Sequence, residues 1–399
     1  ISKGNKKIIV AVIDTGIDHT HPDLQTNMWR NPGEKENDGI DNDGNGYVDD
    51  IYGWNTLENN ANARDDHSHG THCAGIVGAA HNGVGTMGVA GQVQLMSLKF
   101  LSAGGVGNTT DAIKAIEYAI KNQADILSNS WGGDGYSQAL FEAIVEAHKH
   151  SILFVAAAGN DHTNNDKDPM YPASYNVANV ISVAASDSRD IITSFSNWGL
   201  QTVHLAAPGA RILSTVLEGA YEPHSGTSMA TPHVAAALAV LKSYLSKLSH
   251  MDLKKRLLAT VDKQFYLEGL VFSGGRLNLY NALMNITPPP PPAPQEWIET
   301  AYTLSSPHQY PALSKLRWTI HHPGAKFLRI HFEKFVTEKR IDYVAILNSK
   351  EQVVESLTGN LGVFWSRPIA GDTVTLVLRS DSENQEYGFD IGKYAYVKE

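Results

Sequence analysis

The stretch HSGTSMATPHVAAALAVLKSYL, residues 224–245, carries the clearest structural signal in this chain. Ser228 stands among glycine and small residues, and the alanine-rich apolar run after it is typical of a buried helix. We expect Pro232 in the first turn of that helix, where proline is tolerated. A hydroxyl at a helix N-terminus lies near unpaired amides and the positive end of the helix dipole, which favour developing negative charge. Taken alone, Ser228 is better explained as a helix N-cap.

Two upstream segments supply groups that would activate such a hydroxyl. A serine is a weak nucleophile until a base removes its proton, and that base needs an acid to orient it. Asp14 ends KKIIVAVID (residues 6–14), an apolar run typical of a buried parallel strand, so its carboxylate is expected at the carboxyl end of a sheet. His69 lies in HSHGTHCAGIVGAA (residues 67–80), a turn that enters a small-residue helix. The alternatives are an Asx turn at Asp14 and a metal site at His69 and His72, although no HExxH motif accompanies them.

Apolar strands alternate with amphipathic helices between Asp14 and Ser228. This alternation predicts an α/β fold in which a parallel sheet has helices on both faces. The expected strands are residues 93–101, 124–131, 151–159 and 179–186, and the expected helices are residues 109–122 and 137–151.

The pattern changes after TPPPPPAP, residues 287–294. Five consecutive prolines predict a stiff polyproline II linker, with a ligand for a proline-binding module as the alternative. The β-rich patterning of residues 295–399 predicts an all-β sandwich or jelly roll. We therefore divide the chain into an α/β domain at residues 1–286, a linker at 287–294 and a β domain at 295–399.

Four motifs in the α/β domain resemble those of subtilisin-like serine proteases, the subtilases. They are DTGID, HGTHCAG, AAAGN and SGTSMATPHVA, in this order, within residues 8–250. The resemblance implies a subtilisin-like fold and a serine endopeptidase that forms an acyl-enzyme. It assigns Ser228 as the nucleophile, His69 as general base and then acid, and Asp14 as the carboxylate that orients the imidazole. Asn160 would donate to the oxyanion beside the Ser228 amide; without the resemblance it is better explained as a turn residue.

Cys73 is the single cysteine, so no disulfide forms within the chain. Its place in HGTHCAG resembles the cysteine-bearing branch of subtilases, the proteinase K and thermitase type, and implies a thiol packed under His69. A cysteine nucleophile is the alternative, but Ser228 already fills the matching position. The neighbouring His67 is expected to be a solvated loop residue.

The resemblance also implies where a substrate binds. Subtilases hold an extended peptide by strand addition, with main-chain hydrogen bonds along the cleft and pockets for side chains. The expected edges are Gly104, Gly105, Val106 and Gly107 on one side, and Ser130, Trp131 and Gly132 on the other. A flexible glycine loop is the alternative for the first edge. Met170 falls where subtilases often have a small residue at the base of the primary specificity pocket, which predicts a shallow pocket for medium apolar side chains.

The acidic stretch DGIDNDGNGYVDD, residues 38–50, predicts a calcium site, with a solvated loop as the alternative. Gly46 stands at the sixth place of an EF-hand-like loop, but Tyr52 replaces the glutamate of the twelfth place, so this is no EF-hand. The expected ligands are Asp41, Asp43, Asn45 and Asp49, completed by Asp38 or Asp50. The family resemblance adds a second calcium site at Asp23 and Asn82. Further acidic candidates are Asp65 and Asp66.

Short segments of the β domain resemble a CUB-like domain that lacks its cysteines: SSPHQYP, FEKFVTE, DYVAI and SDSENQEYGFDI. The resemblance places Glu338, Asp342 and Asp381 near the calcium-binding corner with which some CUB domains bind proteins. Solvated acidic loops are the alternative. We expect this domain to bind a protein partner, attach the enzyme to a surface or shape the cleft.

Composition limits the kinds of partner that this chain is expected to bind. A net charge of −10 gives no reason to bind nucleic acid or anionic membranes, and no run of about 18 apolar residues predicts a membrane span. The chain begins at Ile1 without a signal-like segment, which with the resemblance predicts a processed enzyme, secreted or periplasmic, made with an inhibitory propeptide. The substrates would be proteins or peptides. The alternatives are a non-catalytic adhesion protein on a subtilase scaffold and a protease selective for one partner.

Overall fold

The computed structural model describes residues 3–188, 190–287, 297–339, 341–351, 353–366 and 368–398. The predicted linker, apart from Thr287, lies outside the described residues. The chain forms two compact units: Ile1–Ile192 with Ser196–Pro289, and Pro290–Glu399 with Thr193–Phe195. No helix within the described ranges is long and apolar enough to cross a membrane.

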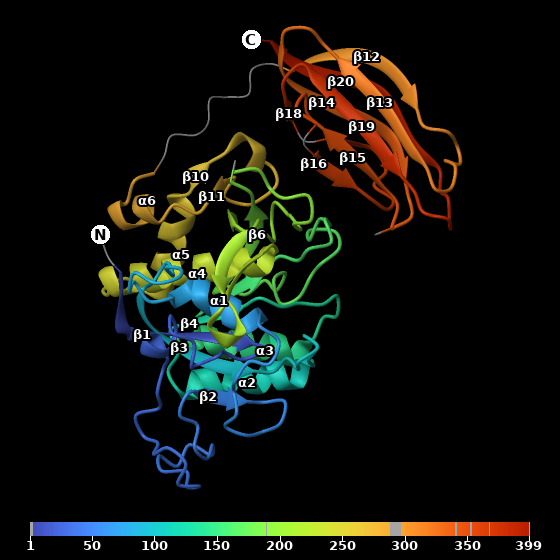
Figure 1. The fold of residues 1–399 in the computed structure, drawn as a ribbon. Helices are drawn as coiled ribbons and strands as arrows, with labels where there is room; N and C mark the ends of the chain where they lie inside the picture. The colour runs from blue at the N-terminus through green and yellow to red at the C-terminus, as the bar shows by residue number, and fades with distance from the viewer. Residues whose placement is uncertain are drawn as a thin grey trace. The chain divides into compact units, whose positions relative to one another are not determined.

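A nine-stranded sheet forms the centre of the first unit (Figure 1). Its strand order is β10-β11-β7-β6-β5-β4-β1-β3-β2, and all neighbours are parallel except β10 and β11. The strands are β1 (Gly4–Asp14), β2 (Gly53–Asn55), β3 (Gln92–Lys99), β4 (Ile126–Asn129), β5 (Leu153–Ala157), β6 (Val180–Ser186), β7 (Leu205–Pro208), β10 (Asp262–Lys263) and β11 (Gly275–Arg276). The strands predicted from the apolar runs are therefore present as β1 and β3 to β6.

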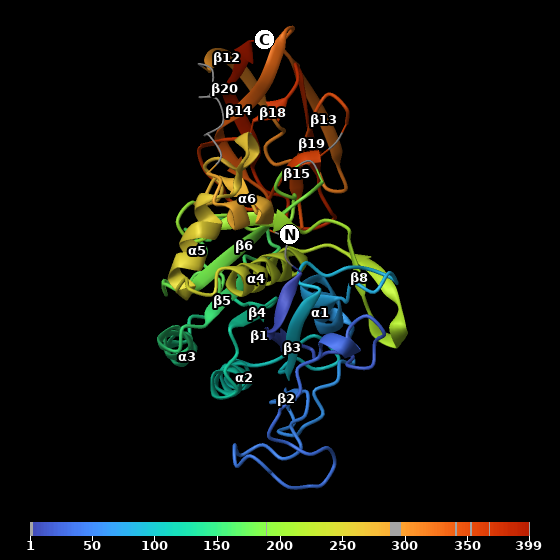
Figure 2. The same ribbon diagram turned by 90° about the vertical axis from the view of Figure 1, so that its left-hand side faces the viewer.

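Helices cover both faces of this sheet, which confirms the predicted fold class (Figure 2). Helices α2 (Thr109–Lys121) and α3 (Gln138–Lys149) lie on one face, and α1 (His69–Gly78) and α4 (Thr227–Tyr244) lie on the other. Successive side chains of a strand point to opposite faces of the sheet, so β1 contributes to the packing on both faces. Ala11 and Ile13 pack in the cluster that contains α2 and α3, so Val10 and Val12 point to the opposite face, and all four are fully buried.

Helices α2 and α3 each have a polar residue as their N-cap. Asn108 accepts a hydrogen bond from the Asp111 amide at the start of α2, and Ser137 does the same for Leu140 at the start of α3. These N-caps satisfy amides that have no partner within the helix. The smaller helical elements of the first unit are α5 (His250–Ala259), α6 (Leu279–Met284) and three 3-10 turns at Gln25–Asn27, Leu217–Gly219 and Phe265–Leu267.

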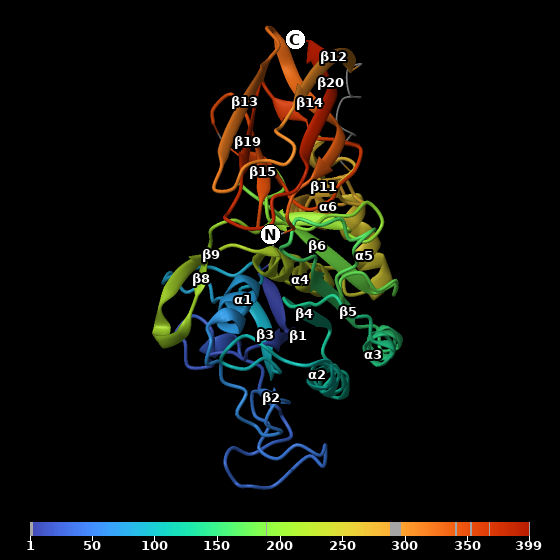
Figure 3. The same ribbon diagram turned by 90° about the vertical axis from the view of Figure 1, so that its right-hand side faces the viewer.

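A separate antiparallel hairpin, β8 (Ile212–Thr215) and β9 (Tyr221–His224), lies beside α1 (Figure 3). It lies outside the central sheet, and only two residues separate its last residue from the start of α4. The sequence patterns did not predict it, because each strand has only four residues and little apolar alternation.

The second unit is built from two antiparallel sheets around one core. One sheet has the order β12-β20-β14-β17 with β18 also paired to β14, and the other has the order β13-β19-β15-β16. Their bounds are β12 (Ile298–Ser305), β13 (Lys315–His321), β14 (Ala325–Val336), β15 (Tyr343–Leu347), β16 (Val353–Leu357), β17 (Phe364–Trp365), β18 (Ile369–Ala370), β19 (Thr373–Arg379) and β20 (Gly388–Lys398). Ile330 and Phe332 from one sheet share a buried cluster with Ile346 and Leu376 from the other. The predicted all-β architecture is confirmed.

Candidate active site

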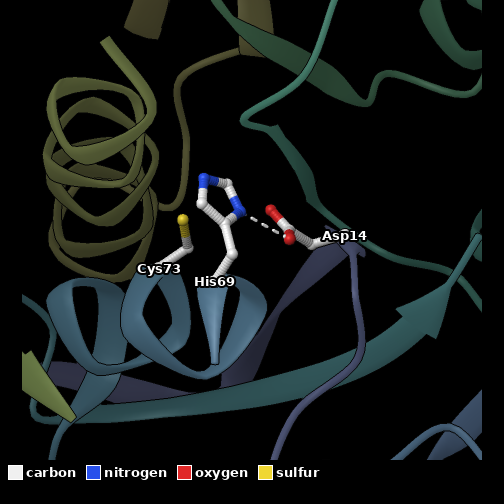
Figure 4. A group of neighbouring side chains, drawn as sticks. All are labelled: Asp14, His69 and Cys73. Atoms are coloured by element: carbon white, nitrogen blue, oxygen red, sulfur yellow. Dashed lines mark hydrogen bonds and ion pairs between the residues drawn. The ribbon is translucent and has the colours of Figure 1, made fainter. Parts of the chain in front are cut away.

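A buried Asp14 and a half-buried His69 form an acid–base pair at the carboxyl edge of the sheet. Asp14 is the last residue of β1 and is fully buried, and His69 is the first residue of α1. His69 Nδ1 lies 2.7 Å from Asp14 Oδ1, and Figure 4 shows the imidazole between this carboxylate and Cys73. Gly70 permits this approach, because a Cβ there would lie 2.1 Å from the Gly16 carbonyl oxygen. The Asp14 carboxylate thus selects the tautomer in which Nδ1 carries the proton, which leaves Nε2 as the basic nitrogen.

The charge of Asp14 determines the basicity of His69. Burial alone lowers the pKa of this imidazole, but the Asp14 charge and hydrogen bond together outweigh burial and raise the pKa of His69 above its usual value. Asp65 adds a smaller effect in the same direction. His69 is therefore a stronger base than a solvated histidine, which suits proton abstraction near neutral pH.

Ser228 is the second residue of α4, at the helix N-terminus that the sequence indicated. Its hydroxyl donates to the Ser130 carbonyl oxygen over 3.2 Å. Within the described residues, no hydrogen bond joins Ser228 Oγ to His69. Catalytic hydrogen bonds are often long or misaligned until substrate binds, so this geometry does not exclude the pair.

The expectation that Pro232 lies in the first turn is wrong. Helix α4 begins at Thr227, which makes Pro232 its sixth residue, in the second turn. A proline at this place cannot donate to the carbonyl four residues earlier, which belongs to Ser228. That carbonyl instead accepts from Ser130 Oγ at 2.8 Å and from Cys73 Sγ at 3.4 Å. The missing helical bond is thus replaced by contacts that hold the Ser228 backbone to both neighbouring elements.

Asn160 lies beside the start of α4, three residues after β5. Its side-chain oxygen accepts from Thr227 N at 2.9 Å and from Thr227 Oγ1 at 3.1 Å. Because both partners are donors, the atom that faces them is the amide oxygen, and the Nδ2 group is available to a ligand. The arrangement suits donation to an anion formed next to Ser228.

A cleft of about 720 Å³ opens beside His69. Every predicted edge residue lines it: Gly104, Gly105, Val106, Gly107, Ser130, Trp131 and Gly132. Met170 does not line this cleft but lies next to Gly132 and Gly159, because a Cβ at Gly132 would be 3.3 Å from its Cγ and a Cβ at Gly159 would be 3.2 Å from its Cε. Exposed as expected, His67 nevertheless lines the cleft, with its Nε2 3.3 Å from a Cβ built on Gly105. The only sequence feature that indicated a place in the cleft is the spacing of two residues between His67 and His69.

The acidic loop brings together a set of oxygens that differs from the predicted one. Carboxylate oxygens of Glu34, Asp41 and Asp43 lie within 4.8 Å of one another. Glu34 was missed because it precedes the acidic stretch. Asp49 instead accepts from the amides of residues 38 and 39, at 3.1 Å each, and lies outside this trio. Asn45 donates to Asp43 and to the buried Asp50, whose pKa is raised by burial. The trio supplies hard oxygen donors and concentrated negative charge, so these residues fit Ca²⁺.

The predicted second calcium site does not fit a cation in the same way. Asp23 and Asn82 are in contact, but Asn82 presents its Nδ2 donor to Asp23 Oδ1 at 2.9 Å. Asp23 Oδ2 accepts from the Thr86 amide at 3.2 Å and from the Tyr221 hydroxyl at 2.8 Å. Burial and this bond raise the pKa of Tyr221 to about 12, so the hydroxyl remains a donor. The pair thus supplies one carboxylate, whereas the acidic loop supplies three.

The second unit gathers the three acidic residues suggested by the CUB-like segments. Carboxylate oxygens of Glu338, Asp342 and Asp381 lie within 4.8 Å of one another, and Asp342 is fully buried. Asp342 accepts from the Tyr310 hydroxyl at 2.7 Å and from the Asp381 amide at 2.8 Å. Glu338 Oε2 is buried without a hydrogen-bond partner among the described residues. A buried orphan oxygen beside two further carboxylates fits a divalent cation.

The other histidines, acids and the thiol near His69 have structural partners. His72 stacks on His224 and bonds to the Glu222 carbonyl oxygen, so it does not share a metal site with His69. The remaining acids are also engaged: Asp65 accepts from the Thr71 amide and hydroxyl in the first turn of α1, and Asp66 pairs with Lys99. Burial, with the nearby Asp14 charge, raises the pKa of Cys73 well above its usual value, which makes this thiol a poor nucleophile.

The first unit has a parallel sheet covered by helices, an aspartate–histidine pair at the carboxyl edge of this sheet and a serine at the start of a neighbouring helix. This is the arrangement of a serine endopeptidase. Comparison with known proteins agrees. The family model described as "Subtilase family" matches residues 5–276. The chain therefore belongs to the subtilase family.

Relatives and a solved structure each match more than half of the chain. The thermophilic serine proteinase of Bacillus sp. (strain AK1) is 35% identical over 284 residues, 71% of this chain and 63% of that protein. Subtilisin-like protease 2 of Plasmodium falciparum (isolate 3D7) is 36% identical over 245 residues, 60% of this chain and 17% of that protein. The chain thus spans less than two thirds of either relative. The crystal structure of a cold adapted subtilisin-like serine proteinase matches with a TM-score of 0.55 and 29% identity, covering 68% of this chain and 87% of that one.

Proposed function

We propose that this chain hydrolyses peptide bonds as a serine endopeptidase, through an acyl-enzyme. Ser228 is the nucleophile, His69 the general base and acid, and Asp14 the residue that orients and stabilises the imidazole. The observation that carries this assignment is the 2.7 Å contact between Asp14 Oδ1 and His69 Nδ1 at the edge of the cleft.

The proposed reaction follows from these positions. His69 Nε2 takes the proton of Ser228 Oγ while this oxygen bonds to the substrate carbonyl carbon. The carbonyl oxygen becomes an anion and accepts from Asn160 Nδ2 and from the Ser228 amide. His69 then gives its proton to the leaving amine, the C–N bond breaks, and water releases the acyl group by the same steps.

The cleft suits an extended peptide. Gly105 and Gly132 both line it, and their backbone groups would pair with a peptide strand as the two edges of the cleft. Met170 lies next to Gly132, at the position that the subtilase resemblance gives to the base of the primary pocket, so we propose a shallow pocket for medium apolar side chains.

Covalent labelling tests the catalytic assignment. A sulfonyl fluoride or phosphonate should modify Ser228 in calcium-replete protein, and Ser228→Ala should abolish both labelling and hydrolysis of a peptide library. Intact protein without labelling or hydrolysis would favour the alternative, an adhesion protein on a subtilase scaffold. Cleavage confined to one sequence of the library would indicate a selective processing enzyme.

We propose Ca²⁺ as a stabilising cofactor. Glu34, Asp41 and Asp43 would hold one ion in the first unit, where it would offset the repulsion of three carboxylates. Glu338, Asp342 and Asp381 would hold another in a CUB-like second unit, where it would order loops for a protein partner. Asp23 and Asn82 are not proposed as ligands, because they supply a single carboxylate where each of the other two sites supplies three.

The wider setting is proposed from the subtilase resemblance: an exported enzyme of the cysteine-bearing branch, made as a zymogen with an inhibitory propeptide. Cys73 beside the imidazole supports the branch assignment. Cell fractionation of the natural source would test export, and recovery of the protein from the cytoplasm alone would contradict it.

A further inference from the structure

The β8–β9 hairpin joins the two helices that carry His69 and Ser228, although the proposed reaction does not use it. Ser214 Oγ and Thr215 Oγ1 on β8 each donate to a carbonyl oxygen of α1, that of His72 and that of Thr71 respectively, over 2.8 Å. The return strand β9 ends at His224, and α4 begins three residues later. The hairpin is thus bonded to the helix of the base and covalently continuous with the helix of the nucleophile.

The hairpin approaches α1 closely at a glycine. A Cβ at Gly75 would lie 2.2 Å from Thr215 Oγ1 and 2.3 Å from Ser214 Oγ. A larger residue there would displace these two hydroxyls, which bond to α1. The contact surface therefore has little room to shift.

His72 makes the central contact between α1 and β9. It follows His69 by one helical turn and is fully buried. Its Nε2 lies 3.0 Å from the Glu222 carbonyl oxygen, which only accepts, so Nε2 carries the proton. Its ring stacks on that of His224, with centroids 4.2 Å apart and planes 4° from parallel.

We propose that His72 is a positioning residue, which sets the place of Ser228 relative to His69 through Glu222 and His224. The inference rests on the proposed function, because it assumes that His69 and Ser228 react together. Proton transfer and attack need near-contact distances, and a displacement of about 1 Å can cost about 100-fold in rate. A rigid link between the two helices meets that need.

The charges around His72 agree with a permanent link. Burial, with the nearby His224 imidazole, lowers the pKa of His72 to about 4. The titratable groups that face the stacked pair are His69 on α1 and Glu222 on β9, whose carboxylate is 3.5 Å from His224 Nε2. His72 is therefore neutral wherever His69 is able to act as a base, and the stacked rings do not repel each other.

Three variants test the proposal. His72→Phe keeps a ring on His224 but loses the donor to Glu222, whereas His72→Gln keeps an N–H donor. His204→Phe is the matched control, because burial also lowers the pKa of His204, to about 3, and it bonds the Ser182 amide on β6. The assays are kcat and KM with a peptide substrate, the rate of phosphonate labelling of Ser228, and the melting temperature.

We expect His72→Phe to lower kcat and labelling by about 10- to 100-fold with little change in KM, and His72→Gln to recover part of this loss. His204→Phe should lower the melting temperature with kcat within about twofold. The proposal is overturned if His72→Phe loses no more kcat than His204→Phe at equal loss of stability. If His72→Phe does not fold, His224→Ala replaces it with the same expectation. Activity retained by Ser228→Ala would refute the proposed function instead.

Discussion

Replacing Asp14 with asparagine tests the electrostatic core of the site. The substitution keeps the shape of the side chain but removes the charge that lies 2.7 Å from His69 Nδ1. Two unit charges at this separation attract by about 6 kcal/mol at an effective dielectric constant of about 20. This energy is gained only when His69 takes the serine proton, so its loss lowers kcat by about 10⁴-fold.

The same substitution shifts the pH profile. His69 acts as a base only when neutral, so kcat falls as the pH drops through its pKa, which the Asp14 charge raises above the usual value. In Asp14→Asn this acidic limb should move to lower pH. The assay is kcat for a chromogenic peptide between pH 5 and 10, an interval that extends about 1.5 units below and about 3.5 units above the ordinary histidine pKa of about 6.5.

Asp66→Asn is the matched control. Its carboxylate pairs with Lys99 and is about half exposed, with 52% of its side-chain surface accessible. Lys99 is buried, but its ammonium also donates to the carbonyl oxygens of Thr15 and Leu101, and water screens the half-exposed carboxylate, so kcat should stay within about fivefold. The electrostatic reasoning fails if Asp14→Asn retains kcat within about tenfold of the parent protein, or if the acidic limb stays in place.

Three further predictions concern the oxyanion, calcium and the specificity pocket. Asn160→Ala should lower kcat by about 100- to 1,000-fold with KM nearly unchanged, because the donor acts on a charge that exists only in the transition state; equal kcat would exclude this donor. Glu34→Gln should lower the melting temperature by about 5 °C in calcium but not in excess chelator. The control, Glu36→Gln at an exposed residue, should leave the melting temperature unchanged in both conditions. If chelator does not change the melting temperature of the parent protein, the calcium proposal is contradicted. Met170→Gly should raise kcat/KM for aromatic over medium apolar side chains by about tenfold or more, and an unchanged preference in a peptide panel would remove Met170 from the pocket.

The sequence predicted the central α/β fold because periodicity is a local property. The apolar run that ends at Asp14 specifies a strand buried on both faces, and the strand of residues 153–157 follows the same rule. The β8–β9 hairpin had no such signal, since its strands are short and stabilised by polar contacts with α1. Pro232 was misplaced by a turn because nothing in the sequence shows that the Ser228 carbonyl has partners outside the helix.

Site residues show the same division between local and distant information. Asp14, His69, Asn160 and Ser228 stand in short motifs, so their identities follow from the sequence alone. Their distances do not, because Asp14 and His69 are 55 positions apart and meet only through the sheet and α1. Tyr221 bonds to Asp23 from 198 positions away, whereas Glu34 joins the acidic trio from just before the acidic stretch.

The sequence by itself determined the class of this protein, through motif order and strand–helix alternation. The resemblance already grouped Asp14 with His69, and Glu338 with Asp342 and Asp381, but only tertiary structure decided their distances, and it alone revealed the contact of His72 with β9. The physical reason is that hydrophobic periodicity acts over a few residues, whereas hydrogen bonds and charges act between groups that only the folded chain brings within a few ångströms.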